Sequence, residues 1–251
     1  MKRVVVALAI GAAAAGLDAA AAAAAKVTRE TVAIDQDKRP YYLFVPDTLD
    51  AQPAPLLVVL HGSNRDGRSL VDPWRDLASH ERFIVAGPDA TDRSGWQVPD
   101  DGPAFLYFLV EAVKAKHAID PRRMYLFGHS AGAGFGIVMA LMESEYFAAA
   151  AVHAGGLQQT GRDQLLNANR KIPIAIFQGT GDATVPVGVA REARDVLTAK
   201  GFPVKLTEIG GHTHNYYGSA DNINRQAWDF LKAVVLDEDP RYQIYNYQKR
   251  R

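Results

Sequence analysis

The 251-residue sequence contains no cysteine. This absence excludes a cysteine nucleophile, a thiolate metal site and a lipid-modified N-terminal cysteine. A chain without disulfides must be stabilised by its hydrophobic core alone, and a chain of this length can supply such a core. Hydrophobic residues make up 48% of the chain and charged residues 22%, as is ordinary for one globular domain.

An excess of charge of either sign is also missing. The chain carries 28 basic and 28 acidic residues, and no long cationic stretch occurs in it. Nothing therefore indicates a nucleic acid or an anionic membrane surface as a partner. We expect an ester substrate, either small or attached to a polymer, with no nucleic acid and no stable membrane anchor. The oligomeric state stays open.

The one low-complexity tract is an alanine-rich stretch at the N-terminus. There, Lys2 and Arg3 precede a short apolar run, and small residues follow it. This order is typical of a secretory signal peptide with cleavage after Ala25. A retained membrane anchor is the alternative, which Asp18 within the stretch disfavours. We expect a signal peptide over 1–25 and a secreted or periplasmic protein.

Beyond the leader, short apolar runs alternate with longer segments that have helical spacing. Strands are expected at 27–34, 41–45, 55–60, 83–86, 124–127, 147–152, 172–177 and 203–209. Helices are expected at 69–82, 102–117, 131–142, 187–200 and 220–235. This alternation predicts a doubly wound, mostly parallel sheet with helices on both faces. One α/β domain should cover 26–236, followed by a C-terminal extension over 237–251.

The pentapeptide Gly128-His-Ser-Ala-Gly132 has the pattern Gly-x-Ser-x-Gly between an apolar strand and an apolar helix. In that setting, a serine on a tight turn exposes its hydroxyl as a nucleophile, so we predict Ser130 as the nucleophile of an α/β-hydrolase. The alternative is that Ser130 only caps the helix. A dinucleotide site is disfavoured because residue 137 is isoleucine where that motif needs glycine.

In the α/β-hydrolase fold the acid and then the histidine follow the nucleophile along the chain. His212 and His214 lie just after the last predicted strand, and His212 is the predicted base because glycines precede it; His214 is the alternative. Asp182 follows the strand 172–177 through a Gly-Thr-Gly turn and is the predicted acid. Asp163 is the reserve choice.

Further site residues follow from the same arrangement. The oxyanion of the reaction needs two preset donors, and we predict the backbone N–H groups of Ala131 and Ser63. Trp96, Tyr216 and Tyr217 are candidate aromatic walls for a ring-bearing substrate, and packing within the core is the alternative for each. We expect no cofactor and no metal ion. Because only one short segment separates the strands at 147–152 and 172–177, little or no cap domain should cover the site.

Three stretches together resemble a known family. They are Leu56-Leu-Val-Val-Leu-His-Gly62, Ile119-Asp-Pro-Arg-Arg-Met-Tyr-Leu-Phe-Gly-His-Ser-Ala-Gly132 and Gly179-Thr-Gly-Asp-Ala-Thr-Val-Pro186. They look like secreted α/β-hydrolases of the polyhydroxybutyrate-depolymerase-like and feruloyl-esterase group. The resemblance runs from about residue 39 to residue 235 and implies the α/β-hydrolase fold. It also carries the roles of the triad over to Ser130, Asp182 and His212.

Two departures from the pattern of that group concern its substrate. Its members commonly place Trp-Pro one residue after the catalytic histidine, where His214-Asn215 stand if His212 is the base. Many depolymerases have cysteine at the position of Ser63. The resemblance therefore implies a serine esterase without fixing the ester: feruloyl or acetyl groups on polysaccharide, or a polyhydroxyalkanoate polyester. A serine peptidase and a catalytically inactive binding protein are the alternatives.

Overall fold

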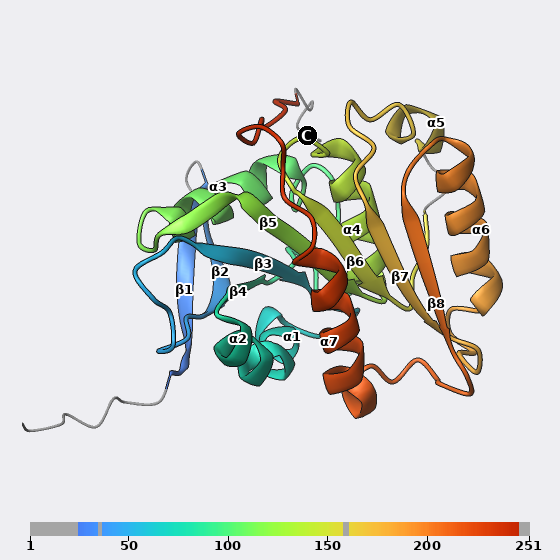
Figure 1. The fold of residues 1–251 in the computed structure, drawn as a ribbon, viewed down its shortest axis with the longest axis horizontal. Coiled ribbons are helices and arrows are strands. Elements are labelled where there is room, and N and C mark those ends of the chain that lie inside the picture. Colours follow the sequence, from blue (N-terminus) through green and yellow to red (C-terminus); the bar gives the residue numbers. More distant parts are fainter. Residues whose placement is uncertain (1–24, 35–36, 158–160, 246–251) are drawn as a thin grey trace, which may run out of the picture.

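The computed structural model describes residues 25–34, 37–157 and 161–245. These residues form one twisted sheet of eight strands with helices on both faces (Figure 1). The strands are β1 (Val27–Ile34), β2 (Asp37–Phe44), β3 (Ala54–Leu60), β4 (Ile84–Pro88), β5 (Ile119–His129), β6 (Ala149–His153), β7 (Ile174–Gly179) and β8 (Val204–Ile209). The helices are α1 (Gly67–Val71), α2 (Arg75–Glu81), α3 (Pro103–Lys114), α4 (Ala131–Met142), α5 (Arg162–Leu165), α6 (Val187–Ala199) and α7 (Ala220–Leu231).

The strand order is β1-β2-β4-β3-β5-β6-β7-β8. β2 pairs antiparallel with β1 and β4, whereas β4, β3 and β5 to β8 run parallel. Every residue of β3 is buried, as expected for a parallel strand that has helices over both faces. This architecture confirms the predicted α/β-hydrolase fold, and it brings the carboxyl ends of β5 to β8 to one edge of the sheet.

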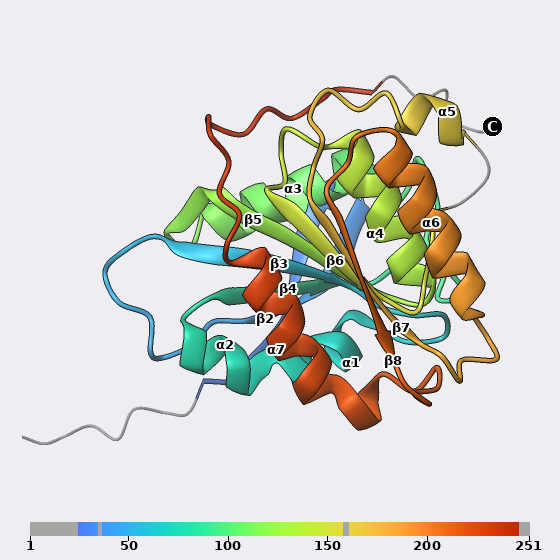
Figure 2. The ribbon, with the colours of Figure 1, turned by 45° about the vertical axis from the view of Figure 1, so that its right-hand side comes forward.

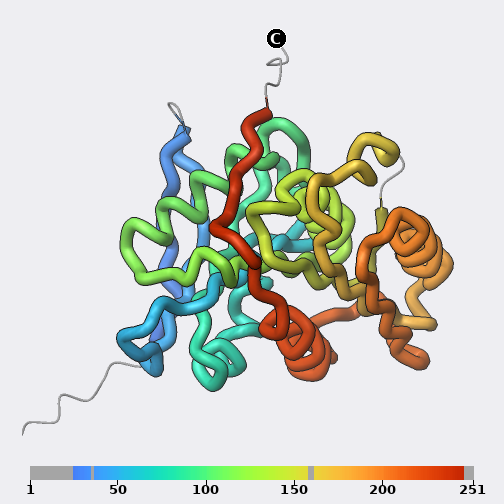
Figure 3. Tube along the Cα trace, turned by 45° about the horizontal axis from the view of Figure 1, so that its top comes forward, coloured from blue at the N-terminus to red at the C-terminus, as the bar shows by residue number. Residues whose placement is uncertain are grey.

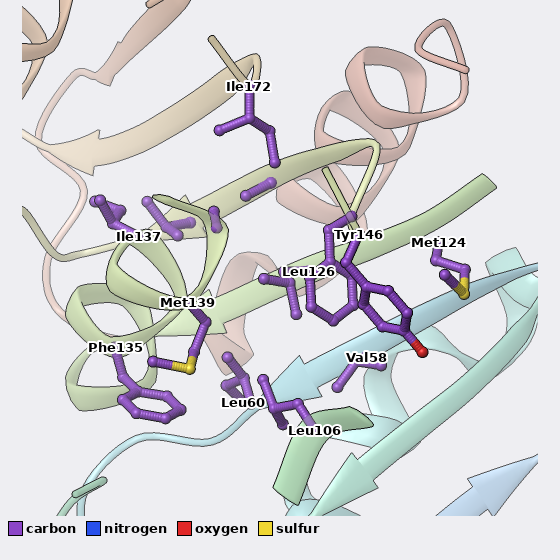
Figure 4. Packing of buried hydrophobic residues seen from close by; sticks show 14 of the residues in the cluster. Val58, Leu60, Leu106, Met124, Leu126, Phe135, Ile137, Met139, Tyr146 and Ile172 are labelled. Carbon is purple, nitrogen blue, oxygen red and sulfur yellow. The ribbon is translucent and has the colours of Figure 1, made fainter. Parts of the chain in front are cut away.

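Two hydrophobic cores lie on the two faces of the sheet. Helices α3, α4 and α6 cover one face, and α1, α2 and α7 cover the other (Figure 2). Helix α4 is apolar almost all round because it lies in the middle of its layer, against both β5 and β6. Figure 4 shows side chains of α3, α4 and the central strands meeting in the first core, among them Leu106, Met139 and Leu60.

Most predicted elements are present within a few residues of their expected bounds. The predicted helix over 69–82 is instead divided into α1 and α2 by the 3₁₀ turn Asp72–Trp74, because Pro73 lacks the N–H group that an α-helix needs there. Strand β5 begins five residues before its predicted start at residue 124. No helix among the described residues is both long and apolar enough to cross a membrane. Apart from Ala25, the predicted signal peptide lies outside the described residues.

Residues 237–245 contain no helix or strand and lie against α3 and the end of α4 (Figure 3). The ring of Tyr242 stacks on that of Tyr107 with 4.2 Å between centroids. The backbone N–H of Gln243 donates to a carboxylate oxygen of Glu143 at 3.0 Å. This part of the predicted C-terminal extension is therefore packed on the domain at the end of α4 opposite to Ser130.

Candidate active site

Ser130 occupies the turn between β5 and α4. Its backbone has φ 56° and ψ −116°, a conformation that costs a non-glycine residue about 1–3 kcal/mol. The surroundings hold it there, since the Ser130 N–H donates to the carbonyl of His153 at 3.0 Å. A Cβ on Gly128 would lie 2.1 Å from the oxygen of Gly132, and one on Gly132 would lie 2.0 Å from the oxygen of Leu60. Only glycine fits at both positions, and the predicted strand–turn–helix geometry is present.

His214 lies between Ser130 and Asp182. Its Nε2 is 2.8 Å from the Oγ of Ser130, and its Nδ1 is 2.8 Å from the Oδ2 of Asp182. The Asp182 carboxylate can only accept, so Nδ1 carries the proton and Nε2 is free to accept the proton of the serine hydroxyl. The side chain of Asp182 is fully buried, whereas that of His214 is 26% exposed. These three side chains form one hydrogen-bonded chain that a substrate can reach.

The prediction that His212 contacts Ser130 is wrong. Its Nε2 lies 3.0 Å from the Nε2 of His153, and its side chain is hydrogen-bonded to neither Ser130 nor Asp182. The reason is the backbone of the loop: the His212 N–H donates to Ile209, and the His212 carbonyl accepts from Gly181 in the acid loop. Residue 212 is thereby held within the turn, and the chain needs two more residues to reach the nucleophile.

Asp182 is held by four hydrogen bonds. Its Oδ1 accepts from the backbone N–H groups of Thr184 and Val185, both at 2.9 Å, and its Oδ2 accepts from Gln178 as well as from His214. Burial raises the pKa of the carboxyl group, but the bonds from Val185 and His214 outweigh it, so the pKa lies below its ordinary value. Asp182 is therefore ionised at neutral pH.

Asp163, the alternative acid from the sequence analysis, lies exposed on α5 and takes no part in the hydrogen bonds of the triad. Among the described residues, no group of three or more histidine, aspartate or glutamate side chains could hold a metal ion.

The loop after β3 lies beside the nucleophile, where one oxyanion donor is predicted. A Cβ on Gly62 would lie 3.3 Å from the Cβ of Ser130. His61 fixes this loop: its Nε2 accepts from the N–H of Ala90 at 3.1 Å, so its Nδ1 carries the proton and donates to the carbonyl of Gly62. Sequence reasoning did not assign this role to His61, although the His-Gly pair after a buried strand marks the loop.

Within the described part of the chain, neither predicted oxyanion donor is used by another protein group. The backbone N–H groups of Ser63 and Ala131 have no acceptor there. Both follow residues that lie at the nucleophile, Gly62 in the β3 loop and Ser130 itself. Their role as the oxyanion hole stays a prediction.

Trp96 stands over the same loop. Its Nε1 donates to the carbonyl of His61 at 2.8 Å, and its ring stacks on Phe135 with 5.2 Å between centroids. Trp96 also lines a cavity of about 500 Å³ together with apolar residues of α4 such as Val138. Trp96 therefore remains a candidate for substrate contact, through a cavity that runs along α4 away from Ser130.

The prediction that Tyr216 is a wall of the substrate site is wrong. Its side chain is fully buried, its hydroxyl donates to Asn224 at 2.6 Å, and its ring stacks on that of His129. The chain turns into the core after His214 to begin α7, and this turn carries Tyr216 beneath the site. Tyr217, which is half-buried, lies under the guanidinium group of Arg65 at 5.0 Å.

Comparison with known proteins assigns the chain to a family. The model of the esterase PHB depolymerase family matches residues 39–232. The poly(3-hydroxyalkanoate) depolymerase C of Paucimonas lemoignei is 35% identical over a 220-residue alignment, which covers 70% of this chain and 53% of that protein. A bifunctional acetylxylan esterase/xylanase of Neocallimastix patriciarum is 29% identical over 148 residues, covering 57% of this chain and 21% of that protein. The chain thus spans about half the length of the first relative and about a fifth of the second.

Solved structures show the same fold at low sequence identity. A ferulic acid esterase from Anaeromyces mucronatus, in complex with ferulic acid, superposes with a TM-score of 0.66 at 17% identity, over 86% of this chain and 92% of that one. A thermostable esterase superposes with a TM-score of 0.65 at 23% identity, over 83% of this chain and 63% of that one. From the match of the family model and the two sequence relatives, this α/β-hydrolase chain belongs to the esterase PHB depolymerase family.

Proposed function

We propose that this protein is a serine hydrolase that cleaves carboxylic esters through an acyl-enzyme. The observation that carries the proposal is the hydrogen-bonded chain from Asp182 through His214 to Ser130, with both heavy-atom distances at 2.8 Å. Family membership and the two sequence relatives, which are named as a depolymerase and an esterase, support ester chemistry.

In the first half-reaction, the Oγ of Ser130 attacks the ester carbonyl while the Nε2 of His214 takes the hydroxyl proton. The imidazolium so formed is stabilised by the ionised carboxylate of Asp182 behind it. The N–H groups of Ser63 and Ala131 would donate to the oxyanion, and each such donor contributes about 2.7–4 kcal/mol to the transition state. His214 then gives its proton to the leaving alkoxide, which leaves the acyl group on Ser130.

In the second half-reaction, water replaces the alcohol. His214 takes a proton from the water, which attacks the acyl-enzyme, and then returns that proton to the Oγ of Ser130 as the acid leaves. The enzyme regains its starting protonation, so each cycle converts one ester and one water into an acid and an alcohol. Every proton moves through the one imidazole that contacts Ser130.

For the substrate, we propose feruloyl or acetyl esters carried on polysaccharide, with a polyhydroxyalkanoate polyester as the second candidate. The acetylxylan esterase relative favours the first, and the 35% identical depolymerase favours the second. We also propose export of the protein, which rests on the leader sequence over residues 1–25.

The test compares wild type with Ser130→Ala on p-nitrophenyl acetate and butyrate. We expect kcat/KM to fall by at least about 10⁴-fold and labelling by a fluorophosphonate probe to disappear. Ser79→Ala on α2 is the matched control and should retain wild-type rates, because among the described residues Ser79 accepts a hydrogen bond from Thr48 through its backbone carbonyl, which the substitution keeps. Equal rates for wild type and Ser130→Ala would overturn the proposal. A panel of feruloyl, acetyl-xylan, hydroxybutyrate and peptide substrates then separates the substrate classes.

A further inference from the structure

Three buried or half-buried imidazoles form a row beside the triad. The Nδ1 of His129 lies 3.0 Å from the Nδ1 of His153, and the Nε2 of His153 lies 3.0 Å from the Nε2 of His212. Ser219 ends the row with its Oγ 3.5 Å from the Nδ1 of His212. None of these rings contacts the hydroxyl of Ser130, so the proposed reaction gives the row no role.

The middle ring of the row uses both of its nitrogens. A neutral imidazole has one N–H and one lone pair, so His153 must donate to one neighbour and accept from the other. Burial, and then the neighbouring imidazoles, lower the pKa of His153 to about 3; burial, and then His214, lower the pKa of His129 to about 4. These two rings are uncharged at neutral pH, and His153 fixes the tautomers of both its partners.

The row joins the loops that carry the triad. His129 immediately precedes Ser130, and the backbone of His153 accepts the N–H of Ser130. At the other end, His212 stands two residues before His214 in the base loop, and its carbonyl is bonded to Gly181 in the acid loop. The side chain of His153 therefore connects the nucleophile turn to the loop that must hold the base 2.8 Å away.

The row also lies next to the imidazole ring of the base, His214. The His129 ring lies 5.2 Å from that of His214, and the buried ring of Tyr216 also lies 5.2 Å from it. A shift of His129 would therefore be passed to His214. If these side chains served only for packing, polar rings would not be needed here. Apolar rings of similar size would fill the same space and would avoid the burial of two pairs of ring nitrogens.

We propose that His153 is a positioning residue, which sets the separation of Ser130 and His214 by holding His129 and His212 in one hydrogen-bonded row. The proposal rests on the proposed function, since it concerns the geometry of that reaction. A misplacement of about 1 Å can cost a reaction about 10²-fold. Loss of the row should therefore lower kcat and leave substrate binding almost unchanged.

The test uses His153→Phe, which keeps a ring of similar size and removes both nitrogens. We expect kcat for p-nitrophenyl butyrate to fall by about 10- to 100-fold with KM within about twofold of wild type. His153→Gln keeps one donor and one acceptor, so its kcat should be at least about threefold higher than that of His153→Phe. The same replacement at an exposed site, His80→Phe, should leave kcat unchanged, because the His80 side chain is 82% exposed.

A double-mutant cycle shows whether His153 acts through its neighbour. His212→Phe alone should lower kcat by about 3- to 10-fold, and the double variant with His153→Phe should be no slower than His153→Phe alone, within about twofold. Independent packing effects would instead multiply, and that result would overturn the proposal. If His153→Phe does not fold, His212→Phe and His153→Gln test the proposal in its place. A wild-type kcat in His212→Phe overturns the proposal, and a loss in kcat at constant KM supports it.

The measurements separate the positioning role of His153 from the proposed function. If wild type hydrolyses no ester, the proposed function fails, whatever the row does. If wild type is active and His153→Phe has kcat within about twofold of it, only the inference fails. Spectra of ¹⁵N-histidine-labelled protein test the row itself without any substrate: hydrogen-bonded neutral imidazoles are expected at pH 7 and should be lost in His153→Phe.

Discussion

Replacing His214 with alanine removes two contacts at once, the one to the Oγ of Ser130 and the one to the carboxylate of Asp182, each 2.8 Å long. The serine then has no base, and the buried carboxylate is left without its partner. Loss of a triad histidine costs about 10⁴- to 10⁶-fold in kcat, or about 5–8 kcal/mol of transition-state stabilisation. We expect His214→Ala to retain only the residual rate supplied by the oxyanion donors and binding.

His212→Ala provides the comparison, since it changes the same residue type two positions away. It removes the 3.0 Å hydrogen bond to His153 and the long 3.5 Å contact to Ser219. Such a bond is worth about 0.5–1.5 kcal/mol net, so kcat should fall by about threefold to tenfold. The two alanine variants should therefore differ in kcat by about three orders of magnitude or more, although each removes one imidazole from the same loop.

The assay is steady-state hydrolysis of p-nitrophenyl butyrate at saturating substrate, with a thermal melt of each variant to show that it is folded. The reverse order, with His212→Ala inactive and His214→Ala within tenfold of wild type, would refute the assignment of the base. Equal losses in the two variants would refute it as well, because, of these two histidines, only His214 is hydrogen-bonded to the hydroxyl of Ser130.

Two further predictions concern the framework of the site and the stability of the fold. Gly132→Ala would place a Cβ 2.0 Å from the oxygen of Leu60, so urea unfolding should show that the free energy of unfolding falls by at least about 3 kcal/mol. Gly188→Ala is the control and should not destabilise the fold, because a Cβ there would have nothing within 4 Å. Equal stabilities of the two variants would contradict the packing argument. Burial raises the pKa of Glu143 to about 7 from 4.5, so its ionisation costs stability as the pH rises from 4.5 to 7, by up to about 3 kcal/mol. Glu143→Gln, which can still accept from Gln243, should therefore melt several degrees higher than wild type at pH 8 and equally at pH 4. A constant difference across that range would show that burial of this carboxyl group does not set its pKa.

The sequence by itself determined the elements of the fold and the place of the nucleophile. Short continuous apolar runs such as residues 55–60 are typical of strands buried on both faces, and their alternation with helices favours a parallel sheet. The Gly-x-Ser-x-Gly pattern between a strand and a helix predicted a tight turn at Ser130. In the structure Gly128 lies against the backbone of Gly132 within that turn, whereas Gly132 lies against Leu60 of β3, which is far away in the chain. Chain order then favoured Asp182 as the acid, with Asp163 in reserve, and limited the base to one short loop.

Only the tertiary structure decided which side chains of that loop meet the nucleophile. His212 and His214 are both plausible from their neighbours in sequence, and the choice depends on a hydrogen bond from Gly181, some thirty residues earlier, to the carbonyl of His212. The burial of Tyr216 depends likewise on the path into α7. Contacts with distant strands set the direction in which a loop side chain points. Local patterns of hydrophobic residues and glycines do not encode those contacts.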